Sequence, residues 1–109
     1  MKDCIFCKII EKKIPADIVF EDERVVVFKD IKPKAPIHLL IVPKKHIISV
    51  NEIEEKDKEI MGELLLVAKK MAEENKIKDF GYKLAINVGE GAGQEVSHLH
   101  IHLLGGWKN

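Results

Sequence analysis

Near its C-terminus the chain reads His98-Leu99-His100-Ile101-His102-Leu103-Leu104, in which three histidines alternate with large apolar residues. Successive side chains of a β-strand point to opposite faces, so a strand here places all three imidazoles on one face and the apolar side chains in a core. A helix would scatter the histidines around its surface at about 100° per residue. We therefore predict a strand from His98 to Leu104. Because three protonated imidazoles on one face would repel one another, we expect a site that works with neutral histidines.

Three interpretations of this imidazole face are open. Histidines two residues apart on a strand can share a metal ion, a middle imidazole can attack an electrophile, or the face can simply be polar and solvated. The glycine-rich turn from Gly89 to Gln94 favours the nucleophile, because alternating glycines let backbone N–H groups approach an anion closely. The turn is neither a P-loop nor a dinucleotide fingerprint, since a strand follows it. The two features together indicate a phosphate held against an imidazole.

Size and charge restrict the class of protein. A chain of 109 residues, 46% of them hydrophobic, predicts one domain spanning residues 1–109. Eighteen basic and eighteen acidic side chains balance, so no basic field is present for a nucleic-acid backbone and we expect no nucleic-acid partner. No apolar run is long enough to cross a membrane and no secretion leader is readable, so we expect a cytoplasmic protein without membrane contact.

Apolar periodicity predicts an α+β architecture around an antiparallel sheet. We expect a short helix at Ile5–Ile10 and a long helix, capped by Asn51 with Glu54 as its capping-box partner. The apolar residues of the long helix cover more than one face, so it needs a second burial partner, either a wrapping sheet or a second copy of the chain. The expected strands are Ile18–Glu21, Arg24–Lys29, Ile37–Val42, Tyr82–Asn87 and His98–Leu104.

The segment from Gly93 to Gly106 resembles the signature of the histidine triad family of nucleotide hydrolases and transferases. It is most similar to the Hint branch, in which Gly-Gly follows the triad. The resemblance implies a five-stranded antiparallel sheet with a short N-terminal helix and one long helix, pairing into a homodimer. It continues upstream through Ile14-Pro15-Ala16, Glu21-Asp22, Phe28–Ile31, Ala35–His38 and Val42–His46.

The resemblance also implies a reaction. The substrate would be a purine nucleoside monophosphate of the AMP type, joined to an amine or another leaving group. His100 would attack the α-phosphorus and form a nucleotidyl-histidine that water cleaves, and His38 and His102 would complete the catalytic set. The chain has no paired carboxylates for magnesium, so we expect no catalytic metal. The alternatives are a nucleotide-binding protein with vestigial turnover and a zinc-dependent hydrolase that uses the triad as ligands.

Further positions match the family's substrate contacts. Asn87, Gly93 and Gln94 match groups that bind near the phosphate, and Asp30 matches the acid that accepts from the ribose hydroxyls. An apolar slot suits a flat base, and the positions that match it are Ile5, Phe6, Ile9, Phe28, Ile31 and Leu40.

Two departures from the family pattern stand out. Glu95 occupies a position where eukaryotic members carry a serine or threonine that helps to hold the phosphate. A carboxylate there would repel phosphate, so the resemblance assigns it no role. The tail after Gly106 is only Trp107-Lys108-Asn109, shorter than the Trp-Pro-Pro tail of the Hint branch, which leaves the leaving-group preference open.

The two cysteines, Cys4 and Cys7, form a single C-x-x-C. A redox motif would need a thioredoxin-like β-α-β setting, which is missing, whereas plain buried thiols and a zinc site both remain open. Some prokaryotic histidine triad proteins carry a zinc ion that two distant histidines complete, and His46 and His98 match these partners. Because two cysteines and two histidines close a tetrahedral shell, the resemblance implies a structural Zn²⁺.

Overall fold

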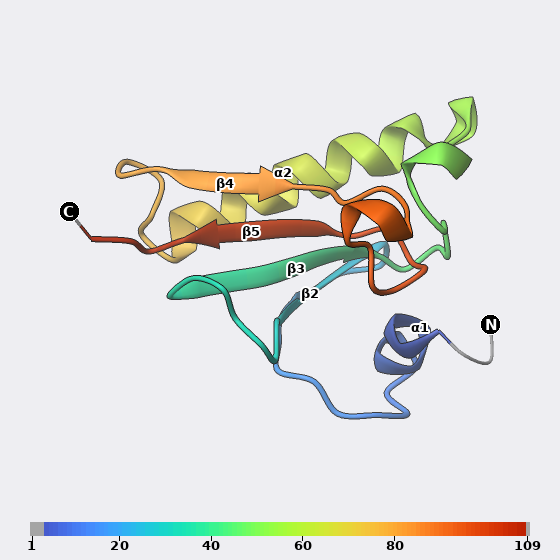
Figure 1. Ribbon diagram of the computed structural model, residues 1–109, viewed down its shortest axis with the longest axis horizontal. Helices are drawn as coiled ribbons and strands as arrows, with labels where there is room; N and C mark the ends of the chain where they lie inside the picture. Colours follow the sequence, from blue (N-terminus) through green and yellow to red (C-terminus); the bar gives the residue numbers. More distant parts are fainter. Residues whose placement is uncertain (1–3, 109) are drawn as a thin grey trace.

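A five-stranded antiparallel sheet lies between two helices in the computed structural model, which describes residues 4–108 (Figure 1). The strand order is β1-β2-β3-β5-β4. No helix of the described residues is long and apolar enough to span a membrane. The predicted fold class and the predicted first helix are confirmed. The elements are α1 (Ile5–Ile10), β1 (Ile18–Glu21), β2 (Val25–Lys29), β3 (Ile37–Pro43), η1 (Val50–Glu52), η2 (Glu55–Asp57), α2 (Lys58–Glu74), β4 (Tyr82–Ala85), η3 (Glu90–Ala92) and β5 (Ile101–Gly105).

The register of the central strands sorts their side chains onto two faces. Leu40 of β3 lies opposite both Phe28 of β2 and His102 of β5, and directly opposed residues point to the same face. Their neighbours Leu39 and Leu103, also opposite one another, point to the other face. The helix α1 packs on the first face and α2 on the second. The imidazole of His102 in β5 therefore lies on the α1 face, while α2 covers the main core.

The buried stripe of α2 matches the periodicity of its sequence. Ile60, Leu64 and Met71 lie in the main core against the sheet. Leu65 and Leu66, which widen the apolar surface of the helix, are 54% and 66% exposed. The sheet of this chain does not cover them, so a wrapping sheet is excluded as their burial partner.

The predicted start of the long helix is wrong. Ser49, not Asn51, caps the first turn, because its hydroxyl oxygen accepts from the Asn51 backbone N–H at 3.1 Å. The backbone then turns extended at Ile53 and the helix begins only at Lys58. Glu54 does form a capping box, but with Asp57, whose carboxylate accepts from the Glu54 backbone N–H at 2.9 Å. Two short 3₁₀ turns therefore replace the first two turns of the predicted helix.

The predicted strand His98–Leu104 begins three residues late, at Ile101. The chain before it leaves the ladder, and the Leu99 backbone N–H donates to the carbonyl of Ile47 instead. The alternation of faces is nevertheless confirmed, because the Phe6 ring of α1 lies 5.9 Å from the His98 ring and 5.1 Å from the His100 ring. The predicted strand Tyr82–Asn87 likewise ends early, at Ala85.

Candidate active site and metal centre

A cavity of about 390 Å³ opens on the α1 face of the sheet, within the usual size range of small-molecule sites. Apolar side chains from α1, β2 and β3 form one part of its wall. The β2–β3 loop, β5 and the loop before β5 supply polar groups to the rest. Of the residues predicted for the site, those that line the cavity are Ile5, Phe6, Ile9, Phe28, Asp30, Ile31, Leu40, Asn87, Gly93, His100 and His102.

His100 is a buried imidazole with a defined tautomer. Its Nδ1 lies 2.7 Å from the backbone oxygen of His98, and because a carbonyl only accepts, Nδ1 must carry the hydrogen. Burial lowers the pKa of His100, opposed by this hydrogen bond and by the charges of Asp30 and Glu95. The neutral ring keeps its lone pair on Nε2. The arrangement suits a nucleophile whose other nitrogen is held by the backbone.

His38 and His102 form a directed pair of imidazoles. The Lys34 backbone N–H donates to His38 Nδ1 at 3.1 Å, so the neutral His38 ring carries its hydrogen on Nε2. That Nε2–H faces His102 Nδ1 at 2.9 Å and donates to it. The hydrogen of a neutral His102 is consequently on Nε2. Burial, followed by the nearby His100 and His38, lowers the pKa of His102 to about 4, so the ring is neutral near pH 7.

Two groups of side chains are close enough to share a metal ion, and hydrogen bonding separates them. Asp30, His38 and His102 form one group, but the tautomer just derived leaves His38 Nε2 protonated and without a lone pair for a metal. Burial lowers the pKa of His38, so the ring is a neutral donor within a hydrogen-bonded chain. We therefore interpret this group as a hydrogen-bonding relay that lies against the cavity.

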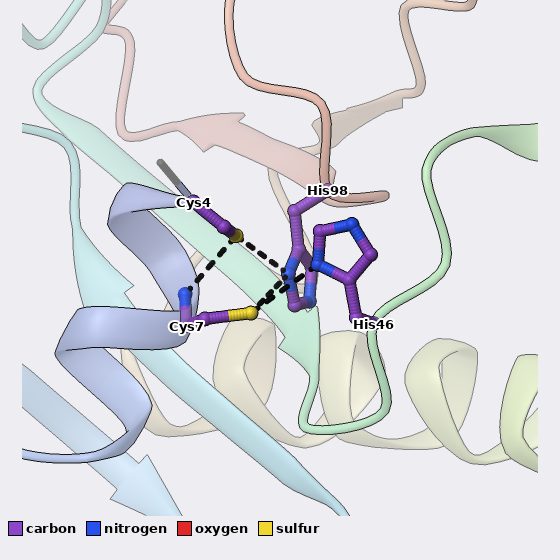
Figure 2. A group of neighbouring side chains, drawn as sticks. All are labelled: Cys4, Cys7, His46 and His98. Atoms are coloured by element: carbon purple, nitrogen blue, oxygen red, sulfur yellow. Dashed lines mark hydrogen bonds between the residues drawn. The ribbon is translucent and has the colours of Figure 1, made fainter. Parts of the chain in front are cut away.

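The second group consists of Cys4, Cys7, His46 and His98, whose ligand atoms all lie within 4.8 Å of one another (Figure 2). Cys7 lies in α1 and Cys4 caps the N-terminus of this helix, while the loops after β3 and before β5 supply the imidazoles (Figure 2). Cys4 Sγ lies 3.2 Å from His98 Nδ1, and Cys7 Sγ lies 3.2 Å from His46 Nδ1. Ligands around one tetrahedral zinc ion lie roughly 3.5 Å apart, given Zn–N and Zn–S bonds of about 2.0 and 2.3 Å.

The hydrogen bonding of His98 also fits a metal ligand. Its Nε2–H donates to the Pro43 carbonyl at 2.8 Å, which leaves the Nδ1 lone pair directed at the two sulfurs. Burial lowers the pKa of His98 to about 4, so the ring is neutral. Burial and the adjacent Cys4 thiol raise the pKa of Cys7 to about 11, because neighbouring thiolates are unfavourable here without a cation. The donor set and its geometry fit a structural zinc ion.

Two of the residues predicted for catalysis and substrate binding, His38 and Gln94, lie outside the cavity lining. His38 is buried, and its Nε2 lies near two residues that line the cavity, 2.9 Å from His102 Nδ1 and 3.5 Å from the Asp30 carboxylate. The side chain of Gln94 fastens its own loop, donating to the carbonyls of Ile48 at 2.7 Å and Val96 at 3.0 Å and accepting from the Gly89 N–H at 2.8 Å. Any contact of residue 94 with a phosphate is thus left to its backbone.

Sequence reasoning missed several residues of the cavity wall. Ile14, Pro15 and Ala16 were noted only as part of the resemblance, yet all three line the cavity after α1 ends. Lys29, Lys32 and Lys34 flank Asp30 along the chain and also line it, as does Glu95. The alternation of lysines with Asp30 and apolar residues in this stretch was the available signal for a polar rim.

The chain is similar to known proteins over nearly its whole length. A family model described as "Scavenger mRNA decapping enzyme C-term binding" matches residues 3–107. An uncharacterised HIT-like protein of Buchnera aphidicola is 50% identical over 104 residues, which is 95% of this chain and 91% of that protein. The purine nucleoside phosphoramidase of Escherichia coli is 45% identical over 105 residues, which is 96% of this chain and 88% of that protein.

A solved structure also matches this chain over nearly its whole length. The HIT family hydrolase from Clostridium thermocellum superimposes with a TM-score of 0.96 at 49% identity, over 99% of this chain and 94% of that one. The fold, the imidazole-lined cavity and these relatives define the class of protein, a nucleotide hydrolase. The chain belongs to the histidine triad (HIT) family, as the resemblance of its sequence predicts.

Proposed function

We propose that this protein hydrolyses purine nucleoside 5′-phosphoramidates and related AMP conjugates through a covalent intermediate on His100. The observation that carries the proposal is the tautomer of His100, a buried imidazole whose Nδ1–H is held by the His98 carbonyl and whose Nε2 is free. The Escherichia coli relative named purine nucleoside phosphoramidase supports the substrate class.

In the first step, His100 Nε2 attacks the α-phosphorus and forms a P–N bond. The bond from phosphorus to the leaving amine breaks, and the amine departs with the electron pair and with a proton from solvent, which the attacking water of the second step returns. Water then attacks the phosphorus of the nucleotidyl-histidine, releasing the nucleoside monophosphate and restoring His100. The Nε2–H of His102, oriented by His38, is placed to donate to a phosphoryl oxygen and stabilise the charge that develops there.

The remaining contacts divide the nucleotide among the parts of the cavity. The ribose hydroxyls donate to Asp30, whose Oδ1 is already fixed by the Lys32 backbone N–H at 2.8 Å. Asn87 and the backbone around Gly93 bind the phosphate. The base lies in the apolar part of the cavity, which is formed by Ile5, Phe6, Ile9, Phe28, Ile31 and Leu40.

The test is hydrolysis of adenosine 5′-phosphoramidate without added metal, by the wild type and by His100→Ala. The wild type releases AMP, and the variant loses activity by about a thousandfold or more, as removal of a covalent nucleophile does. AMP affinity serves as the control, because the variant retains the base and ribose contacts. If both proteins bind AMP and neither hydrolyses the substrate, the protein is a nucleotide-binding module instead.

The cysteine–histidine cluster supports two further parts of the proposal. A Zn²⁺ ion held by Cys4, Cys7, His46 and His98 would fix α1 to the loop after β3 and to the loop before β5. Because four protein ligands fill the tetrahedral shell, the ion would be structural. Free thiols at Cys4 and Cys7 require a reducing compartment, which favours the cytoplasm.

We also propose that the chain forms a homodimer. Leu65 and Leu66 of α2 are largely exposed, and Leu84 on the edge strand β4 is 40% exposed. Leu84 lies opposite Leu103 and so on the α2 face of the sheet, and both elements therefore carry exposed apolar side chains on this side of the molecule. Leu66 lies next to Asp22–Arg24 of the β1–β2 turn, away from β4. Exposed apolar side chains next to an unpaired strand edge favour a second copy of the chain as their cover.

A further inference from the structure

Glu95 is a carboxylate in the cavity wall that the proposed mechanism does not use. It lines the cavity together with His100 and is exposed to solvent. Among residues 4–108 it forms no ion pair within 4 Å and no side-chain hydrogen bond. Asp30, the other acid of the cavity, is different, because its carboxylate accepts from the Lys32 N–H and lies 3.5 Å from His38 Nε2. The charge of Glu95 is therefore free to act on a ligand.

The charge on most of the nucleotide is the same for every substrate of this class. The base and the ribose are uncharged, and the α-phosphoryl group is common to all. The leaving group is the only part whose charge varies between substrates. A fixed charge beside the reacting phosphorus must therefore discriminate among leaving groups, and it needs no direct contact because Coulomb interactions extend over several ångströms in a partly enclosed site.

The charges of the cavity are also unevenly distributed. Lys29 ends β2, and Lys32 and Lys34 follow Asp30 in the β2–β3 loop, whereas Glu95 follows η3 on the loop before β5. These two segments lie apart in the fold (Figure 1). The lysines lie next to the acid that we propose binds the ribose, whereas Glu95 shares the cavity wall with His100, the proposed nucleophile. The charge of Glu95 also reaches the nucleophile, because together with Asp30 it opposes the lowering of the pKa of His100.

We propose that Glu95 is a specificity-determining residue that favours substrates whose leaving amine carries a positive charge. The inference rests on the proposed function and names the leaving-group class for it. Its predicted partner is an amine with a second, cationic group a few bonds from the scissile nitrogen. An amine with a carboxylate at the same position is disfavoured, since like charges repel.

The test compares two isosteric adenosine 5′-phosphoramidates. One has 2-(trimethylammonio)ethylamine as leaving group, and the other has the neutral 3,3-dimethylbutylamine. The kcat/KM ratio of the cationic to the neutral substrate is measured for the wild type, Glu95→Gln and the control Glu90→Gln. Glu90 lies in η3 of the same loop region, is exposed and does not line the cavity. Comparing ratios between proteins cancels the different intrinsic reactivity of the two amines.

We expect Glu95→Gln to lower the ratio about fivefold to tenfold, the effect of one unit charge a few ångströms away in a partly screened site. Glu90→Gln should leave the ratio at the wild-type value. Equal ratios in all three proteins, or an equal decrease in both variants, would overturn the role of Glu95 while the hydrolase itself stands. If the wild type hydrolyses neither compound, the proposed function fails, and this inference with it.

Discussion

The hydrogen-bond partners of the histidines assign each ring a different task. A carbonyl accepts from Nδ1–H of His100, and another carbonyl accepts from Nε2–H of His98. A backbone N–H instead donates to Nδ1 of His38, which leaves the hydrogen of that ring on Nε2. The sequence pattern predicts that three imidazoles share a face, and it is right. It does not give the tautomers, because these depend on carbonyl and amide groups of Pro43, His98 and Lys34 that only the folded backbone positions.

The low pKa of His102 predicts an acid-sensitive stability. Its pKa is about 4 in the folded protein, mainly through burial, against about 6.5 in an unfolded chain. Between these values the unfolded chain binds a proton that the folded chain does not, so the free energy of unfolding decreases as pH falls from 6.5 towards 4. The decrease from this residue is at most about 3 kcal/mol.

The variant His102→Gln keeps an acceptor for the His38 Nε2–H but cannot titrate. Urea unfolding at several pH values between 4 and 7 should therefore show a shallower dependence on pH for the variant than for the wild type. Identical slopes would mean that His102 is protonated equally well in the folded and unfolded chains.

The Gly-Gly after the triad has a physical reason that the sequence alone does not reveal. A Cβ on Gly105 would lie 2.6 Å from Ile77 Cδ1, and Gly106 has a φ of +86°, with Pro36 and Ile37 pressing against it. L-residues rarely adopt such a φ. In the sequence these glycines only mark the resemblance to the Hint branch. In the fold, the absence of side chains at these two positions lets the end of β5 lie close to Ile77, Pro36 and Ile37.

At the scale of elements, α1 links the metal cluster to the cavity. The helix has only six residues, too few to be stable alone in water. Cys7 of the helix and its N-cap residue Cys4 belong to the metal cluster, whereas Phe6 and Ile9 line the cavity and pack against Phe28 in the same apolar cluster. The Phe6 ring contacts both the His98 and the His100 rings edge-on. The position of the base pocket therefore depends on how α1 is held.

We predict that removing zinc weakens nucleotide binding about tenfold while most of the sheet stays folded. Titration calorimetry with AMP, on metal-loaded and chelator-treated protein, measures this change, and circular dichroism verifies the fold. By thermodynamic reciprocity, AMP should raise the affinity for zinc by the same factor. In the variant Cys7→Ser, AMP affinity should match that of the chelated wild type. Unchanged AMP affinity in folded, zinc-free protein would show that α1 holds its place without the metal.

The elements show where sequence reasoning succeeds and where it fails. Strong periodicity located all five strands and the buried stripe of α2, because burial on one face imposes the pattern. The predicted starts of α2 and β5 were wrong, because local hydrogen bonds there compete with those of the regular helix or strand. Asp57 is nearly fully buried, is paired with Lys45 and closes a capping box with Glu54, so the helix starts there. The ion pair joins residues twelve positions apart, which no local pattern reveals.

At the scale of the whole molecule, the unpartnered surface of α2 and β4 predicts the assembly. The wild type should be a dimer of 12.4 kDa chains in light scattering coupled to size exclusion. Leu65→Glu should give a monomer, because it places a charge at an exposed apolar position of α2 in the proposed interface. Val19→Glu makes the same kind of change at a partly exposed position of β1, the opposite edge of the sheet, and should leave the dimer intact. A wild-type monomer, or a dimer that survives Leu65→Glu, would contradict the proposed interface.

The central claim is that His100 becomes covalently bonded to the nucleotide during turnover. The most direct measurement mixes the protein with adenosine 5′-phosphoramidate, quenches the reaction within milliseconds under conditions that preserve phosphoramidate bonds, and determines the intact mass and the modified peptide. We predict a single adenylyl group on the peptide that carries His100, formed before steady-state AMP release and absent in His100→Ala. AMP release at the wild-type rate with no adduct on any histidine would show that water attacks the substrate directly, and the account of this site would be wrong.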